Sequence, residues 1–443
     1  MNPIASLPEI AALDDRRNLV RIPCEQDVPV TGRIRNLIDT SPLRRLSRIS
    51  QLGLVCLVYP GATHTRLEHS LGVYRNVLLF LRRLAALPDF CERMSAETAQ
   101  TLVVAALLHD VGHWPYCHPL EDMQLPGVVP HERLAAHRIC DTEIDSLLSR
   151  DFGIRGDDVI ALLVESSDQP ASRIAHSILS GPIDVDKMDY LYRDSLHAGV
   201  PYGMHYDRQR LIGSLCLDEA GTRLAITEKG CTAAELMVFA RYVMFSEVYW
   251  HHTVRSATAM LQRTVFECQD RIDWDSWYSS DDREFSGLLA ETADQPGLAN
   301  MVDGLFGQRR VLYKRVAQFN VLEDPGLFAR MAGRPHAWLV DLAKRLGEAV
   351  QKRTGIAMGP HDLLIDAPPR GLEIQFQIPV RCEHPLRYRW LGEVSPVVQA
   401  LASRQFDQYV KRIRIFVHPD HAANLRREPE LRGLLSDTLD QMN

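Results

Sequence analysis

The feature that most constrains this chain is the segment 107–118, which reads Leu-Leu-His-Asp-Val-Gly-His-Trp-Pro-Tyr-Cys-His. The apolar run that precedes it, residues 101–108, predicts a buried helix. Adjacent side chains on a helix diverge by about 100°, so His109 and Asp110 can reach one ion only where the helix ends. A glycine and a proline inside the segment supply that ending. The segment therefore predicts a metal site at a helix terminus.

Two other predicted helices carry polar side chains that suit the same site. A helix over 65–84 has Arg66 and His69 three positions apart on one face. A single histidine on such a helix is more often a core residue than a ligand, so both interpretations stay open. Asp186, Tyr190 and Asp194 recur at intervals of four and share one helical face. That stripe is either solvated or lines a polar site.

The two imidazoles and two carboxylates of His69, His109, Asp110 and Asp186 suit a divalent ion. Such mixed nitrogen and oxygen donors bind Mn, Mg, Fe, Co, Ni or Zn, and the residue types do not select among these metals. The spacing is too wide for a local motif, and a His-Asp dipeptide is common by chance. Structural roles in a helical core therefore stay open at this point.

Composition excludes several classes of protein. The 443 residues carry a formal net charge of −7, which argues against a membrane-surface or nucleic-acid-coating protein. An anionic substrate would then need local cations or a metal. One predicted helix face carries Arg44, Arg45 and Arg48, which either contact phosphate or form a solvated surface. The nine cysteines form no CxxC pair, which favours reduced thiols. The start of the sequence has no signal-peptide pattern, so a cytoplasmic location is expected.

Hydrophobic patterning predicts further elements and a domain order. We expect a short strand at 54–60, helices at 132–150, 156–166 and 231–269, and a hairpin around 218–222. In the last third of the chain we expect strands at 372–378 and 412–417 with a helix at 394–410 between them. The predicted order is an irregular segment 1–30, a helical core 31–270, a polar linker or insertion 271–308, and an α+β lobe 309–443.

Several motifs together resemble the HD-domain phosphohydrolase superfamily. They are IDTSPLRRLSRISQLG, THTRLEHSLGV, LLHDVGHWPYCH, His-Glu at 131–132, DVDKMDYLYRD and ARYVMFSEVYWHHTVRSATAML. They occur in the expected order over about residues 32 to 260. The narrower resemblance is to the deoxynucleoside triphosphate triphosphohydrolase branch, which includes the SAM-and-HD-domain enzymes. It implies a mainly α-helical HD core with a small C-terminal α+β lobe.

The resemblance also implies roles for individual residues. The implied metal ligands are His69, His109, Asp110 and Asp186. Histidines for proton transfer or phosphate binding would be His113, His118 and His131. The implied contacts to phosphate or sugar are Gln51, Arg66, Lys187, Tyr190, Asp194, Arg241, Tyr249 and His251. Trp114 departs from the family pattern, which usually has a small residue there, so we expect the pocket to differ in shape at that position.

The activity implied is metal-dependent hydrolysis of a dNTP to a deoxynucleoside and inorganic triphosphate. Two alternatives stay open: another HD-type phosphohydrolase, phosphodiesterase or single-strand nuclease, and a nucleotide sensor that does not hydrolyse its ligand. The expected partners are the dNTP substrate, a nucleotide effector and further copies of the chain in a homo-oligomer. Neither a membrane nor a nucleic acid is expected as a partner.

Overall fold

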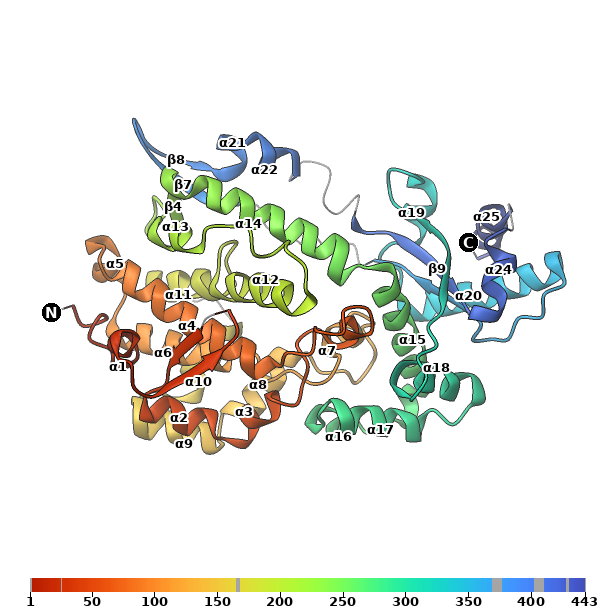
Figure 1. Ribbon diagram of the computed structural model, residues 1–443, viewed down its shortest axis with the longest axis horizontal. Helices are drawn as coiled ribbons and strands as arrows, with labels where there is room; N and C mark the ends of the chain where they lie inside the picture. The colour runs from red at the N-terminus through yellow and green to blue at the C-terminus, as the bar shows by residue number, and fades with distance from the viewer. Residues whose placement is uncertain are drawn as a thin grey trace. The chain divides into compact units, whose positions relative to one another are not determined.

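The computed structural model (Figure 1) describes residues 2–24, 26–164, 168–368, 377–401, 410–427 and 430–442. Its contacts divide the chain into two compact units. The first comprises Met1–His113, Pro130–Met244 and Ile374–Ser403. The second comprises Trp114–Val129, Phe245–Glu373 and Arg404–Asn443. Both units are interrupted in sequence, so the linear domain order expected above stays a prediction.

The first unit is built mainly from helices. They are α1 (Pro8–Ala11), α2 (Gly32–Ile38), α3 (Ser41–Leu46), α4 (Arg66–Leu84), α5 (Pro88–Arg93), α6 (Ala96–Leu108), α8 (His131–Ile139), α9 (Glu143–Leu147), α10 (Gly156–Val164), α11 (Pro170–Ser180), α12 (Val185–Ala198), α13 (Arg208–Gly213), α14 (Cys231–Met244), α21 (Leu391–Val394) and α22 (Pro396–Ala400). Among them, α4 packs against both α6 and α12. These three helices carry most of the candidate site.

The boundaries of α4 and α6 follow from their capping residues. At the start of α4, the side chain of Thr65 accepts a hydrogen bond from the backbone N–H of Glu68. At the start of α6, the side chain of Ser95 accepts a hydrogen bond from the backbone N–H of Thr98. Such caps satisfy backbone N–H groups that have no partner inside the helix. The expected helix over 65–84 is therefore confirmed. Helix α6 ends at Leu108, which leaves His109 as its C-cap.

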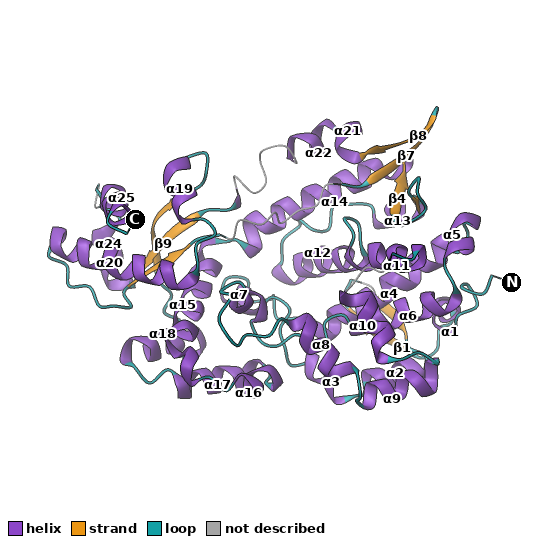
Figure 2. Ribbon diagram, turned by 180° about the vertical axis from the view of Figure 1, so that it is seen from behind, coloured by secondary structure: helices purple, strands orange, loops and turns teal. Residues whose placement is uncertain are grey.

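Two small sheets belong to the first unit (Figure 2). Strands β1 (Leu19–Ile22) and β2 (Gln26–Pro29) form an antiparallel pair within the segment that was expected to be irregular. The other sheet has the order β3-β4-β7-β8. Its strands are β3 (Leu215–Leu217), β4 (Leu224–Thr227), β7 (Pro379–Glu383) and β8 (Leu386–Trp390). The antiparallel pairing of β3 with β4 confirms the hairpin expected around 218–222.

The second unit combines helices with one antiparallel sheet. Its helices are α7 (Cys117–Glu121), α15 (His252–Cys268), α16 (Trp274–Ser279), α17 (Asp282–Thr292), α18 (Pro296–Phe306), α19 (Pro325–Met331), α20 (His336–Thr354), α24 (Pro419–Leu425) and α25 (Leu431–Asp440). Strands β5 (Lys314–Phe319), β9 (Ile413–Val417) and β6 (Leu363–Asp366) pair in that order. Apolar side chains of the sheet, α20 and α25 form one core.

Residues 271–308 were expected to form a polar linker or insertion, but they contain α16, α17 and α18. Asp281 and Glu284 form a reciprocal capping box that starts α17. Aromatic residues of this region are buried, including Trp277 and Phe285. Trp114 is fully buried in the same unit, and its ring centroid lies 5.3 Å from that of Tyr278. A few large aromatic side chains therefore anchor a segment whose average composition is polar.

Three local predictions of secondary structure were wrong. Residues 54–60 form no strand, since Gly53–Leu57 is a 3-10 helix. The helix expected over 132–150 is interrupted between α8 and α9. The helix expected over 231–269 is interrupted by a π-helical turn at Phe245–Tyr249, after which His251 caps α15. In both interrupted helices the apolar periodicity of the sequence continues across the interruption. The periodicity therefore does not reveal the change in backbone hydrogen bonding.

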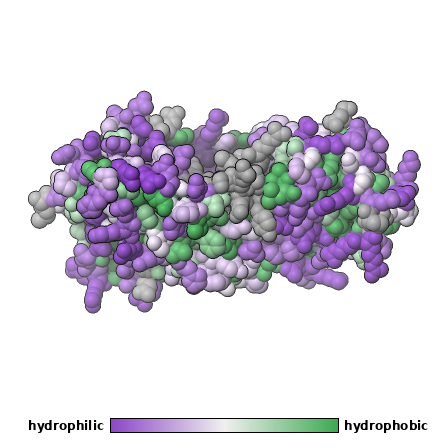
Figure 3. Space-filling view, turned by 90° about the horizontal axis from the view of Figure 1, so that it is seen from above, coloured by the Kyte–Doolittle hydropathy of each residue, from purple (hydrophilic) through white to green (hydrophobic). Residues whose placement is uncertain are grey.

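In the last third of the chain, β9 confirms the strand expected at 412–417. Most of the strand expected at 372–378 lies outside the described residues. Helix α22 lies in the first part of the expected helix 394–410, and residues 402–409 of that expected helix also lie outside the described residues. Among the described residues, no helix combines the length and apolar character needed to cross a membrane. One face of the molecule shows hydrophilic surface interspersed with smaller apolar areas (Figure 3).

The contact between α4 and α12 depends on Gly72. A Cβ atom at this position would lie 1.9 Å from Asp189 Oδ1 and 2.3 Å from Arg193 Nη2. We expect Gly72→Ala to lower the free energy of unfolding by about 1–3 kcal/mol, because the added methyl group overpacks a buried contact. Urea denaturation measures the change. Gly213→Ala is the control, since nothing lies within 4 Å of its Cβ position. Equal effects of the two variants would contradict this account.

Candidate active site

Three of the predicted metal ligands meet where α4 passes the end of α6. Donor atoms of His69, His109 and Asp110 all lie within 4.8 Å of one another. The two Nε2 atoms are 3.2 Å apart, and His109 Nε2 lies 3.4 Å from Asp110 Oδ1. His109 and Asp110 reach a common point because the helix ends at Leu108. The arrangement at a helix terminus is the one that segment 107–118 predicts.

The fourth predicted ligand comes from the first turn of α12. Asp186 Oδ1 lies 3.0 Å from His69 Nε2 and 4.0 Å from His109 Nε2. Divalent metals bind such donors at about 2.0–2.2 Å, and donors on neighbouring coordination positions are then about 3.0–3.5 Å apart by simple geometry. The separations of 3.0, 3.2 and 3.4 Å match that spacing. The four residues therefore fit a divalent cation, and their types leave its identity open.

The second nitrogen of each imidazole has a partner that orients the ring. His109 Nδ1 lies 2.9 Å from the carbonyl oxygen of Ala106, and His69 Nδ1 lies 2.7 Å from Asp189 Oδ2. Such contacts typically fix the tautomer and direct the other nitrogen toward a metal. In both residues that other nitrogen is the Nε2 atom of the cluster described above.

One arginine and two histidines surround the buried carboxylate of Asp110. Its oxygens lie 2.8 Å from Arg66 Nη1 and 3.2 Å from His113 Nδ1. Burial alone would raise the pKa of Asp110, but His113, His109 and Arg66 hold that pKa well below its usual value. The carboxylate is therefore ionised and available as a ligand.

The predicted proton-transfer residues His113 and His131 lie together in the first unit. Their ring centroids are 3.9 Å apart. Gly112 permits this approach, because a Cβ atom there would lie 2.0 Å from the carbonyl oxygen of His131. Arg45 belongs to the basic helix face that the sequence leaves open as a solvated surface or a phosphate contact. In the structure its side chain is buried and donates a hydrogen bond to the carbonyl oxygen of His113.

Lys187 pairs with Asp184, the carboxylate nearest in sequence to the predicted ligand Asp186. Its Nζ atom lies 2.5 Å from Asp184 Oδ2, and Asp184 also accepts from the backbone N–H of residue 187 at 2.6 Å. Burial raises the pKa of Asp184 to about 6. Asp184 is thus the helix cap of α12 and the partner of the lysine, which leaves Asp186 to face the histidines.

The predicted sugar and phosphate contacts of the first unit come from helices α4, α12 and α14 and from the bend that contains Gln51. Tyr190 and Asp194 lie on α12, and Arg241 is buried on α14. Burial raises the pKa of Tyr190, while nearby Arg241 and Lys187 act in the opposite direction. The backbone N–H of Gln51 donates to the carbonyl oxygen of His64 at 2.9 Å.

Three predicted residues belong to the second unit. His118 lies in α7, Tyr249 ends the π-helical turn, and His251 caps α15 with its Nδ1 atom 3.2 Å from the backbone nitrogen of Thr253. Burial lowers the pKa of His251, and Arg414 acts in the same direction.

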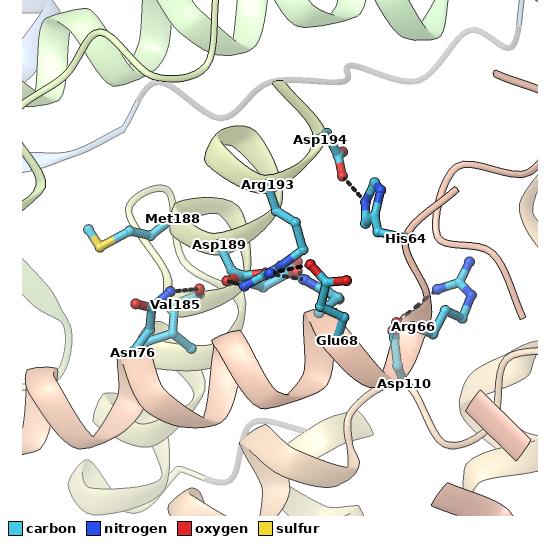
Figure 4. Close-up of polar contacts among 12 residues, drawn as sticks. His64, Arg66, Glu68, Asn76, Asp110, Val185, Met188, Asp189, Arg193 and Asp194 are labelled. Carbon is cyan, nitrogen blue, oxygen red and sulfur yellow. Dashed lines mark hydrogen bonds and ion pairs between the residues drawn. The ribbon is translucent and has the colours of Figure 1, made fainter. Parts of the chain in front are cut away.

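Sequence reasoning missed several residues that contact the predicted ones. Asp194 Oδ1 lies 2.9 Å from His64 Nε2 (Figure 4). Asp189 Oδ2 lies 2.7 Å from Nδ1 of His69. Arg193 holds Asp189 at 2.7 and 2.8 Å. The opposite charges of Asp189 and Arg193 four positions apart were a local signal for their pairing. His64 stood inside a quoted motif but had no assigned partner, because its contact is 130 residues away in sequence.

Comparison with known proteins finds two family regions in the chain. Residues 66–194 match the HD domain and residues 206–431 match the HD associated region. The uncharacterised protein MJ1154 of Methanocaldococcus jannaschii is 32% identical over 69% of this chain and 60% of its own length. The deoxynucleoside triphosphate triphosphohydrolase SAMHD1 of Bos taurus is 24% identical over 59% of this chain and 49% of its own length. The chain thus spans about half to three fifths of these relatives.

Solved structures share the fold. A hypothetical protein from Aquifex aeolicus superposes with a TM-score of 0.71 and 24% identity, covering 92% of this chain and 98% of its own. A phosphohydrolase from Bacteroides thetaiotaomicron has a TM-score of 0.68 and 22% identity, covering 91% of this chain and 100% of its own. The expected helical HD core with a small α+β lobe is therefore confirmed. With the HD associated region matching half of its length, the chain belongs to the HD-domain phosphohydrolase superfamily, in its SAMHD1-like branch.

Proposed function

We propose that this protein hydrolyses dNTPs to a deoxynucleoside and inorganic triphosphate in a metal-dependent reaction. The observation that carries the proposal is the cage formed by His69, His109, Asp110 and Asp186, with donor separations that suit one divalent ion. The deoxynucleoside triphosphate triphosphohydrolase activity by which the SAMHD1 relatives are named supports the choice of substrate. A divalent ion in this cage would polarise phosphoryl oxygens and stabilise the charge that develops on them.

The reaction needs a water molecule to attack the α-phosphorus and the bond to the 5′-oxygen to break. One proton must leave the water, and one must reach the departing 5′-oxygen. The adjacent imidazoles of His113 and His131 are the groups that we assign to these transfers, because histidine changes its charge near neutral pH. His118 is a third candidate, placed on α7.

The remaining assignments concern recognition of the substrate. Arg66, Lys187 and Arg241 would contact phosphate oxygens, since guanidinium and ammonium groups stabilise phosphoryl charge. An acidic protein needs such local cations to hold a polyanion. Residues proposed to surround the nucleoside are Gln51, Tyr190, Asp194, Tyr249 and His251. The proposal also includes a cytoplasmic homo-oligomer, and a nucleotide effector is a further candidate partner.

Product analysis is the decisive test of the substrate. Purified protein is incubated with each dNTP and NTP and with Mn, Mg, Fe, Co, Ni or Zn. We expect deoxynucleoside and tripolyphosphate from dNTPs, in equal amounts. Release of monophosphate, or activity only on cyclic dinucleotides, other phosphoesters or single-stranded nucleic acid, would favour another HD-type hydrolase. Tight dNTP binding without turnover would favour the sensor alternative.

The metal assignment is tested independently of the substrate. We expect Asp110→Ala and Asp186→Ala each to weaken divalent metal binding by more than the 10- to 100-fold typical of residues that only support a ligand. Isothermal titration calorimetry on metal-stripped protein measures the affinity. Asp157→Ala is the matched control, because that carboxylate is largely exposed and pairs with Arg155. Unchanged affinity in Asp110→Ala would refute the ligand assignment.

His113→Ala tests the proton-transfer role. We expect turnover to fall on the order of 10²–10³-fold, because general acid–base catalysis typically contributes at least about 10²-fold to the rate. Metal affinity should fall by no more than the 10- to 100-fold typical of residues that support a ligand, because His113 contacts Asp110 but is not one of the four proposed donors. Steady-state kinetics at saturating metal gives the rate. A variant that retains full turnover would exclude His113 from the reaction.

A further inference from the structure

Arg193 is a fully buried arginine at the centre of an extended polar network in the first unit. Its side chain lies on α12 and has 0% relative exposure. Nε and Nη2 donate to the two oxygens of Asp189 at 2.8 and 2.7 Å. Nη1 donates to Glu68 Oε1 at 2.7 Å and to the carbonyl oxygen of Pro23 at 3.0 Å. One guanidinium thus holds two carboxylates from two different helices.

The first arm of this network leads to the proposed metal ligand His69. Asp189 is buried and receives two hydrogen bonds from Arg193, so its carboxylate has a defined orientation. Oδ2 of that carboxylate lies 2.7 Å from His69 Nδ1. A hydrogen bond at Nδ1 leaves Nε2 to face His109 and Asp186. Carboxylate–histidine pairs of this kind orient metal ligands and increase their basicity.

The second arm leads toward the nucleoside side of the proposed site. Glu68 accepts from Arg193 and also lies 2.9 Å from His197 Nε2. The ring of His197 stacks on that of His64, with centroids 4.3 Å apart and planes 18° apart. His64 Nε2 in turn lies 2.9 Å from Asp194 Oδ1. Asp194 is one of the residues proposed to surround the nucleoside. Figure 4 shows the contacts of Arg193 with Asp189 and Glu68, and the contact of His64 with Asp194.

Packing alone is a weak explanation for this network. Taking charged groups out of water is costly, and well-packed apolar side chains often stabilise a core equally well. The network also requires Gly72, since any side chain on α4 at that position would collide with Asp189 and Arg193. Hydrogen bonds between charged partners are directional, so each of them fixes the orientation of a carboxylate or an imidazole.

We propose that Arg193 is a positioning residue that orients the metal ligand His69 through Asp189 and orients Asp194 through Glu68, His197 and His64. The second arm rests on the proposed function, because it concerns the nucleoside. The first arm concerns metal binding alone. Substitutions on one arm should therefore affect one property, and a substitution of the shared guanidinium should affect both.

Three variants separate the arms. Asp189→Asn keeps the size of the side chain but removes its charge, and we expect it to weaken metal binding by about 10- to 100-fold. Glu68→Gln should leave metal affinity within about threefold and raise the KM for the dNTP, since only the second arm changes. Arg193→Lys should do both, because an ammonium group lacks the planar fork that engages two carboxylates. Arg208→Lys is the control: this arginine also contacts α4, at Asn76, and lies over the ring of Tyr192, and neither residue has a proposed role in the site.

Metal affinity is measured by calorimetry on metal-stripped protein, with circular dichroism to confirm that each variant is folded. KM and kcat are measured at saturating metal. If Asp189→Asn is folded and binds metal as the unsubstituted protein does, the inference is overturned. It is also overturned if Arg193→Lys behaves like Arg208→Lys, or if all three variants lose both properties in proportion to their loss of folded protein. Absence of dNTP hydrolysis would refute the proposed function, and the metal affinities would still decide the role of Arg193.

Discussion

The site depends on how closely α12 approaches α4. Gly72 leaves room for Asp189 and Arg193 of α12 against the face of α4 that also carries Glu68 and His69. The approach brings Asp186, on the first turn of α12, within 3.0 Å of His69. The same packing therefore sets the separation of the metal donors and the orientation of the ring that supplies one of them. An increase of one ångström in the helix spacing would disrupt both, since ligand geometry tolerates only small displacements.

The second constraint is the end of α6. His109 and Asp110 are neighbours in sequence, and a continuing helix would direct them apart. The helix ends at Leu108, after which Gly112 lets the following turn approach α8 closely enough to bring the ring centroids of His113 and His131 within 3.9 Å. Two of the proposed metal donors, His109 and Asp110, and one of the proposed proton-transfer groups, His113, thus come from a single short segment. Its position is held by Arg45, which donates to the carbonyl oxygen of His113 from the helix α3.

Charge is organised locally although the chain is acidic overall. The formal net charge is −7, yet Asp110 lies among Arg66, His109 and His113. Lys187 is paired with Asp184, and Arg193 is paired with Asp189 and Glu68. Each buried charge named here has a partner of opposite sign, which is the condition under which such charges are tolerated in a core. The cations of the site are therefore held in place before any polyanion binds.

Local sequence was sufficient to predict α4, α6 and the hairpin around 218–222, because capping residues, apolar periodicity and turn residues act over a few positions. It was insufficient for the interruptions after α8 and α14 and for the helices of 271–308, where long-range aromatic packing outweighs polar composition. For the site, the residue types of His69, His109, Asp110 and Asp186 indicated metal chemistry. Their convergence, the assignment of Lys187 to Asp184, and the network from Asp189 to Asp194 were decided only by the tertiary structure. The physical reason is that a hydrogen bond between residues 120 or 130 positions apart leaves no periodic trace in the sequence.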